Sequence, residues 1–252
     1  MRIATRNAVL FAAVAVLALP LSLAHAQIAP EPAPTHGQDE VLTVDNSLVA
    51  KDQGKSATNA LTTIYDNTTT PQLVVSSTDL ASQWGDELLM TGTGLLSTHK
   101  FTIYNSSSSA GPLLSATVSL SFFNATTSAP LGGYSGTINF GAGLLANQFS
   151  IITASGLDPL LIILNTNDII VIQQVTAKTG TATRLGVVSM GPNLVGSSPV
   201  DMYINSATIG TGFFCLVAGC TTPSNPGHFV AVNPPPVGTT SKTWGTLKKL
   251  YR

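Results

Sequence analysis

The chain has 252 residues, of which 9% are charged and 44% hydrophobic, and its formal net charge is -1 at pH 7. So few charges exclude a charge-rich disordered chain and a long charged helix. The near-neutral balance also offers no basic surface that would hold nucleic acid. Polar residues are mainly Ser, Thr, Asn and Gln, and 22 Gly and 15 Pro supply frequent breaks. This composition is typical of short β-strands joined by turns.

The first 26 residues have the pattern of an export signal. Arg2 and Arg6 precede an apolar run over residues 8–23, and Ala24-His25-Ala26 places small residues where a signal peptidase cleaves. The alternative is a membrane anchor, but the run is shorter than the roughly 20 residues that span a bilayer, and Pro20 weakens its helical end. We therefore expect residues 1–26 to be a cleaved Sec signal, and the mature chain to be secreted or held at the outer cell surface without a transmembrane segment.

Residues 27–55 predict an extended lead-in. The segment begins with the Pro-rich string IAPEPAPTHG and continues without a sustained period. One strand is expected in it around residues 41–44. The lead-in is followed by a change of pattern, from which we place the folded domain at residues 56–232.

The residue pattern of the folded domain predicts a succession of β-strands. In residues 116–122, Ala116, Val118, Leu120 and Phe122 alternate with Thr and Ser, as in a half-buried antiparallel strand. Turn signals separate further predicted strands at residues 61–65, 72–76, 100–105, 135–140, 148–154, 160–164, 169–175, 184–190 and 202–205. We expect an all-β fold, an antiparallel two-sheet sandwich of jelly-roll-like form. The short connection at residues 165–168 predicts a hairpin between 160–164 and 169–175.

Residues 233–252 predict a Pro-rich spacer followed by a basic and aromatic tail. Trp244, Leu247 and Tyr251 would share one side of a helix, and Lys248 adds charge beside them. We expect these four residues to bind a partner. The alternatives are a loose chain end and a segment that docks on its own sandwich.

Cys215 and Cys220 are the only two cysteines. In an exported protein an isolated even pair predicts a disulfide. The alternative, half of a metal site, lacks a second cysteine pair, and His228 is the only histidine nearby. So small a loop predicts a stabilisation of about 2 kcal/mol or less.

No pattern in the chain identifies a catalytic set, a cofactor site or a metal site. His36, His99 and His228 lack the spacing of metal ligands and are predicted to lie at the surface or at loop ends. The chain also has no G-x-S-x-G motif. We therefore do not expect an enzyme.

The acidic residues leave two alternatives open. Asp86 and Glu87 are adjacent, so on a strand they would point to opposite faces and could not form a general acid/base pair. A carboxylate pair would need a partner from among Asp66, Asp158 and Asp168. Calcium could take oxygen ligands from Asp66, Asp79, Asp86 and Glu87, although no D-x-D-x-D loop supports this.

Sandwich proteins that bind carbohydrate often stack sugars on exposed aromatic rings. Trp84, Tyr104 and Tyr134 are the candidate glycan contacts in the folded domain. The alternative role for these side chains is to fill the core.

Several short segments carry a family resemblance: IYDNTTT, WGDELLMTGTG, ATVSLSFFN followed by APLGG, NFGAG, and RLGVVSMGPNLVGSS before DMYIN. From Asp66 to about Asn205 the chain resembles exported bacterial all-β proteins, many of which carry a sorting tag of the PEP-CTERM type. The resemblance implies a secreted β-sandwich with no catalytic residues to transfer. The chain lacks the tag itself. The TWGTLKKLYR segment is instead similar to short W-G-x-x-K terminal segments of other exported bacterial proteins.

Together these observations predict a secreted or cell-surface β-sandwich protein with a structural, adhesive or matrix role and no cofactor. Its expected partner is a cell-surface or matrix glycan or protein. A carbohydrate-binding module is the alternative, and a glycoside or ester hydrolase is a third hypothesis.

Overall fold

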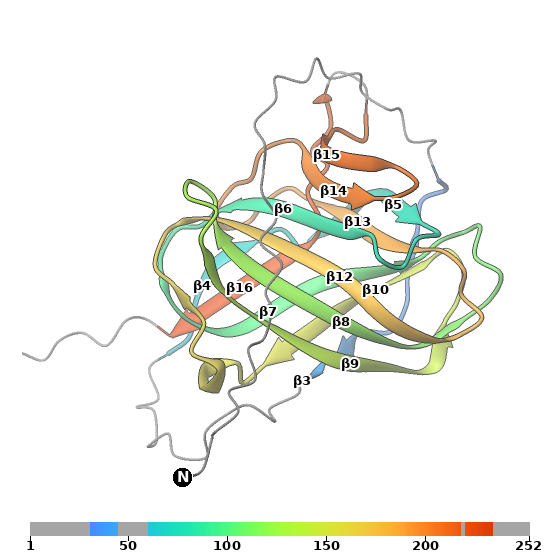
Figure 1. Ribbon diagram of the computed structural model, residues 1–252, viewed down its shortest axis with the longest axis horizontal. Coiled ribbons are helices and arrows are strands. Elements are labelled where there is room, and N and C mark those ends of the chain that lie inside the picture. Colours follow the sequence, from blue (N-terminus) through green and yellow to red (C-terminus); the bar gives the residue numbers. More distant parts are fainter. Residues whose placement is uncertain (1–30, 45–59, 218–219, 234–252) are drawn as a thin grey trace, which may run out of the picture.

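The computed structural model describes residues 31–44, 60–217 and 220–233. Two β-sheets pack face to face and enclose the main hydrophobic core (Figure 1). The expected all-β, antiparallel two-sheet sandwich is confirmed, with short parallel pairings at one edge. In the part of the chain described, no helix is long and apolar enough to cross a membrane.

Sheet A is built on the order β1-β10-β7-β13-β5. These strands are β1 (Thr35–His36), β10 (Gln148–Ser155), β7 (Gly94–Asn105), β13 (Leu185–Gly191) and β5 (Thr70–Ser77). Four more strands join this path: β2 (Glu40–Val41) pairs with β10, β11 (Ile163–Leu164) with β7, and β16 (His228–Asn233) with both β7 and β4 (Thr62–Asp66). Among the described strands, only β1 and β2 pair in parallel, both with β10.

Sheet B has the order β15-β14-β6-β12-β8-β9-β3, and all its pairings are antiparallel. The strands are β15 (Gly210–Phe214), β14 (Met202–Ser206), β6 (Gln83–Leu89), β12 (Asp168–Gly180), β8 (Leu113–Asn124), β9 (Pro130–Leu144) and β3 (Thr43–Val44). In Figure 1 the strands β6, β12, β8 and β9 cross the front of the molecule, with β14 and β15 above them.

The alternation of residue types in β8 explains how the sandwich forms. Its apolar positions, Ala116, Val118, Leu120 and Phe122, are all buried in the main core, while the hydroxyl residues between them are only half-buried. Because successive side chains on a strand point to opposite faces, one face of β8 lies against sheet A and the other faces outward.

Most predicted strands are confirmed, but the predicted hairpin is wrong. A 3-10 turn at Asp158–Leu160 precedes β11, and Leu161 has a left-handed backbone with φ 54. β11 then pairs with β7 in sheet A, whereas β12 lies between β6 and β8 in sheet B. Residues 165–167 therefore connect the two sheets instead of closing a hairpin. The strands β1, β6, β15 and β16 were not among the predicted strand segments.

The expected strand in the lead-in is found, divided between both sheets. β2 lies on the edge of sheet A and β3 on the edge of sheet B. Leu42, between them, is 3% exposed and belongs to the main core. The lead-in thus closes one side of the sandwich.

Candidate functional site

The three aromatic residues considered as glycan contacts are buried. Trp84 is 4% exposed, Tyr104 0% and Tyr134 6%. Trp84 packs inward with Met202 and Ile204, Tyr134 lies in the main core, and Tyr104 lies beneath the lead-in, where it meets Glu31. None of the three presents a ring face to solvent, so this part of the sequence prediction is corrected.

A different set of side chains forms an aromatic and aliphatic row on the outer face of sheet B. The register aligns Phe213, Tyr203, Gly85 and Ile172 across β15, β14, β6 and β12. The rings of Tyr203 and Phe213 are edge to face, with centroids 5.7 Å apart, and Phe213 is 43% exposed. A Cβ on Gly85 would lie 3.3 Å from both Tyr203 and Ile172, so glycine lets these two side chains approach each other.

A row of amide side chains runs beside the aromatic row. Asn205, Gln83 and Gln174 align across β14, β6 and β12. Asn205 donates to Gln83 Oε1 at 3.1 Å, and Thr211 donates to Asn205 Oδ1 at 2.8 Å. Gln174 donates to the carbonyl of Ala81 at 3.1 Å. These mutual hydrogen bonds hold the amide groups in fixed orientations beside the aromatic row.

Acidic side chains border the other side of the aromatic row. Glu87 is half-buried, and Asp168 and Asp201 are near enough to act on it electrostatically. Burial, together with the negative charges of Asp168 and Asp201, raises the pKa of Glu87. We name the outer-face surface formed by Phe213, Tyr203, Gly85, Ile172, Asn205, Gln83, Gln174 and Glu87 the sheet B face.

Asp86 and Glu87 point to opposite faces of β6, as the sequence predicts. Asp86 is fully buried, and neither of its carboxylate oxygens has a hydrogen-bond partner among the described side chains. Burial raises the pKa of Asp86 well above its usual value, and the negative charges of Asp201 and Glu87 add to the shift. Asp86 therefore faces the core and takes no part in the sheet B face.

Two of the three histidines contradict the sequence prediction. His36 is exposed, but His99 and His228 are 0% and 1% exposed. His99 Nε2 lies 3.2 Å from His228 Nδ1, the two rings are stacked, and His99 Nδ1 is 2.7 Å from the Tyr134 hydroxyl. Burial lowers the pKa of both histidines, that of His228 to about 4. The pair is a neutral polar link inside the core.

The remaining carboxylates have separate local roles. Asp66 accepts hydrogen bonds from the backbone and hydroxyl of Thr68, as in a turn. Asp158 accepts from Ser97 at 2.8 Å. Across the described ranges, no three His, Cys, Asp or Glu side chains gather closely enough to hold a metal ion. A hollow beside the lead-in, lined in part by Gln38, Phe140 and Gln148, has a volume of about 30 Å³, far smaller than the several hundred Å³ of a typical ligand pocket.

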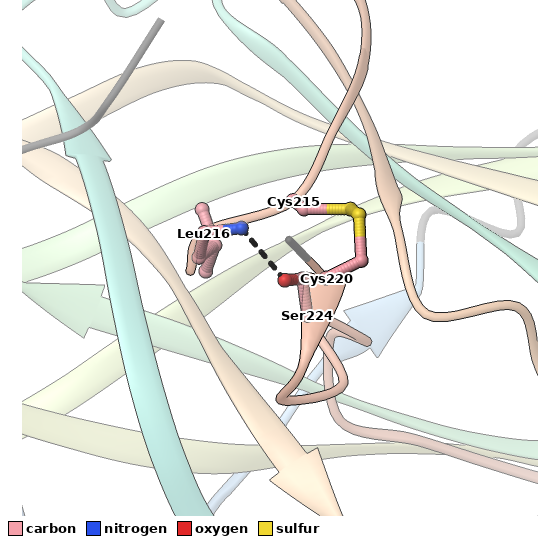
Figure 2. The surroundings of a disulfide bond; sticks show 4 residues. All are labelled: Cys215, Leu216, Cys220 and Ser224. Atoms are coloured by element: carbon pink, nitrogen blue, oxygen red, sulfur yellow. Dashed lines mark hydrogen bonds between the residues drawn. A yellow bond between two sulfur atoms is a disulfide. The ribbon is translucent and has the colours of Figure 1, made fainter. Parts of the chain in front are cut away.

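The predicted disulfide is confirmed. Cys215 and Cys220 are bonded, with their Cα atoms 5.2 Å apart, and the backbone N–H of Leu216 donates to the Ser224 hydroxyl at 2.8 Å beside them (Figure 2). The bridge and this hydrogen bond anchor the connection that leads from β15 toward β16.

Removing this disulfide should cost little stability. The loop between the cysteines is short, so it restricts the unfolded chain only slightly. We expect the double variant Cys215→Ser/Cys220→Ser to lose about 2 kcal/mol or less of unfolding free energy in urea titrations. Thiol titration of the unreduced, denatured wild type should find no free thiol. Two reactive thiols there, or a loss well above 2 kcal/mol, would show that the bridge is not a local brace.

The tail residues Trp244, Leu247, Lys248 and Tyr251 lie outside the described residues, as does the predicted signal segment. The predictions made for these two segments therefore stay predictions. Comparison with protein-family models, with curated proteins and with solved structures finds no match to this chain.

Proposed function

We propose that this protein is a non-catalytic, exported adhesive or matrix protein that binds neutral glycan through the sheet B face. The observation that carries the proposal is the alignment of the aromatic row with the hydrogen-bonded amide row on one outer face of the sandwich. Export rests on the N-terminal signal pattern. This combines the adhesive role expected from the sequence with its carbohydrate-binding alternative, but at different residues.

The chemistry of the two rows matches that of a sugar. A pyranose has an apolar C–H face that packs on an aromatic ring, and Phe213 and Tyr203 supply such rings at a partly exposed position. Its hydroxyl groups both donate and accept hydrogen bonds, as do the amides of Asn205, Gln83 and Gln174. Because these amides are held by one another, little side-chain entropy is lost when they bind.

The charges on this face favour a neutral ligand over an anionic one. Glu87, Asp168 and Asp201 border the aromatic row, and the described basic residue on β12, Lys178, lies near the other end of that strand. An acidic polysaccharide would meet like charge there, whereas a neutral glycan would not.

Replacing the aromatic residues should weaken glycan binding without unfolding the protein. We expect Phe213→Ala and Tyr203→Ala each to raise the Kd for the glycan selected on an array by at least about tenfold, which corresponds to about 1.4 kcal/mol. Isothermal titration with the mature protein measures this change. Phe229→Ala is the matched control, because Phe229 is a half-buried Phe on β16 of sheet A, beneath Lys100. It should leave the Kd within about twofold.

Two results would refute the proposal. One is the absence of saturable binding to any neutral glycan on the array by the folded mature protein. The other is binding that is equally sensitive to Phe229→Ala and to Phe213→Ala, which would place the site away from the sheet B face.

A further inference from the structure

Residues 31–44, which we name the strap, lie along the edges of both sheets of the sandwich. β1 and β2 add to the outer edge of β10 in sheet A, and β3 adds to the edge of β9 in sheet B. In both sheets the strap covers the last long strand on the same side of the sandwich. Without the strap, β10 and β9 would expose unpaired backbone groups, and such edges readily accept another strand.

A polar pocket receives the beginning of the strap. The Glu31 carboxylate accepts hydrogen bonds from Ser106 at 2.7 Å, from the Tyr104 hydroxyl at 3.0 Å and from Ser76, and it lies 3.8 Å from Arg184 Nε. Burial alone would raise the pKa of Glu31, but these hydrogen bonds and Arg184 hold it below its usual value. The pocket therefore recognises an ionised carboxylate and fixes where the strap begins.

An apolar position receives the end of the strap. Leu42 enters the main core between the two sheets, and its backbone N–H donates to Thr153 on β10 at 3.0 Å. Gly136 on β9 makes room for it, since a Cβ there would lie 2.9 Å from Leu42 Cγ and 2.4 Å from the carbonyl oxygen of Thr43. The carboxylate pocket, the two strand edges and this position over Gly136 together form what we name the strap acceptor.

The strap is joined to the sandwich by residues 45–59 alone. A chain of fifteen residues reaches at most about 50 Å when fully extended. A folded domain of about 190 residues has a radius of gyration of roughly 16 Å, so this reach extends to the acceptor of an adjacent molecule. The contacts between strap and acceptor are the same whether they form within one molecule or between two.

We propose that the strap acceptor also binds the strap of a second copy of this chain, so that the protein assembles by strand exchange. Each copy then offers one strap and one acceptor. Exchange can be reciprocal between two copies, which gives a closed dimer, or can continue from copy to copy, which gives a larger ring or a chain. The added strand contributes backbone hydrogen bonds, while Glu31 and Leu42 set its position along the edges.

The test uses two full-length mature variants with one added cysteine each. Thr43 on the strap and Thr137 on β9 are register partners, and both are exposed. Antiparallel partners have Cα atoms about 4.5–5.5 Å apart, within disulfide range. Thr43→Cys and Thr137→Cys are mixed, unfolded and refolded together, then oxidised mildly and separated on a non-reducing gel. A covalent heterodimer forms only when the strap of one molecule occupies the acceptor of another.

Thr117→Cys mixed with Thr43→Cys is the matched control for random collision. Thr117 lies on β8, on the side of Thr137 away from the strap. Two strand spacings separate Thr117 from Thr43, about 10 Å, which exceeds disulfide range. We expect at least about fivefold more heterodimer from the Thr137→Cys mixture, and we expect Leu42→Asp or Glu31→Ala in the strap-bearing chain to reduce it to the control level.

Two outcomes would overturn the inference. The first is a heterodimer yield equal to the Thr117→Cys control at every protein concentration, with the wild type sedimenting as a monomer. The second is a high yield that neither Leu42→Asp nor Glu31→Ala reduces, since the cross-link would then arise outside the acceptor. Circular dichroism of each variant shows whether it is folded, and Glu31→Ala serves if Leu42→Asp is not.

Discussion

Acidification from pH 7 to pH 4 should destabilise the wild-type protein relative to a His228→Asn variant by about 3 kcal/mol. The pKa of His228 falls from 6.5 to about 4 because the ring is fully buried against His99. Each pKa unit corresponds to about 1.4 kcal/mol. Between about pH 6.5 and pH 4, His228 therefore binds a proton in the unfolded chain but stays neutral in the folded chain.

The sign of this effect follows from linkage. Above about pH 6.5 the imidazole is neutral in both states, so it imposes no penalty. Between about pH 6.5 and pH 4 only the unfolded chain is protonated at this site, so stability falls as the pH falls. Below about pH 4 the difference is constant. The pKa of His99 is also lowered by burial and by His228, so it acts in the same direction.

Urea titrations at closely spaced pH values measure the effect, and the difference between wild type and variant removes the contributions of the titrating groups that do not contact His228. Asn retains a polar group near the position of Nδ1, which faces His99. His36→Asn is the control, because His36 is exposed and its pairing with Asp39 is a surface contact of small effect. A wild-type minus His228→Asn difference that does not change with pH would show that the pair is not held neutral in the core.

Asp86→Asn should stabilise the protein at neutral and alkaline pH. The Asp86 carboxyl group is fully buried, neither of its oxygens has a hydrogen-bond partner among the described side chains, and burial raises its pKa well above 3.8. Below about pH 4 the group is protonated in both states and carries no penalty. As the pH rises, the unfolded chain releases the proton more readily than the folded chain, so wild-type stability declines. Asn stays neutral throughout, and we expect a gain of roughly 2 kcal/mol at pH 8.

Thermal melts of Asp86→Asn and wild type between pH 4 and pH 9 check this expectation, and the gain should increase with pH. Asp66→Asn provides the contrast, because Asp66 accepts two hydrogen bonds from Thr68 and its replacement removes a favourable contact. If Asp86→Asn is less stable than wild type at every pH, then the Asp86 carboxylate has a stabilising partner in the folded protein and is not destabilised by its burial.

The expected changes at His228 and Asp86 have opposite signs, although both groups are buried. Burial favours the neutral form of each, which for a histidine is the deprotonated form and for a carboxyl group the protonated one. Burial of His228 therefore lowers the stability of the protein at acidic pH, and burial of Asp86 lowers it at alkaline pH. Measuring both variants across one pH range separates the two contributions.

The sequence alone determined the strands whose alternation is strong and the local cross-link. In β8 the apolar and hydroxyl residues alternate without exception from Ala116 to Phe122, and burial follows the same alternation. The Cys215–Cys220 bridge was predictable because these are the only two cysteines of a chain with the pattern of an exported protein.

β6 was harder to predict. Its inward face carries Trp84, Asp86 and Leu88, and its outward face carries Gly85, Glu87 and Leu89. With an acid and a leucine on each face, hydrophobic periodicity could not show which side is buried.

Only the tertiary structure decided which side chains meet. The row of Phe213, Tyr203, Gly85 and Ile172 joins four strands from distant parts of the chain through strand register. The link between His99, His228 and Tyr134 likewise crosses from sheet A to sheet B. The alternation within a strand is a local property of the sequence, whereas register and sheet order depend on the whole set of competing strand pairings. For this physical reason the sequence identified the sandwich, while the binding face and the buried polar residues became visible only in the assembled sheets.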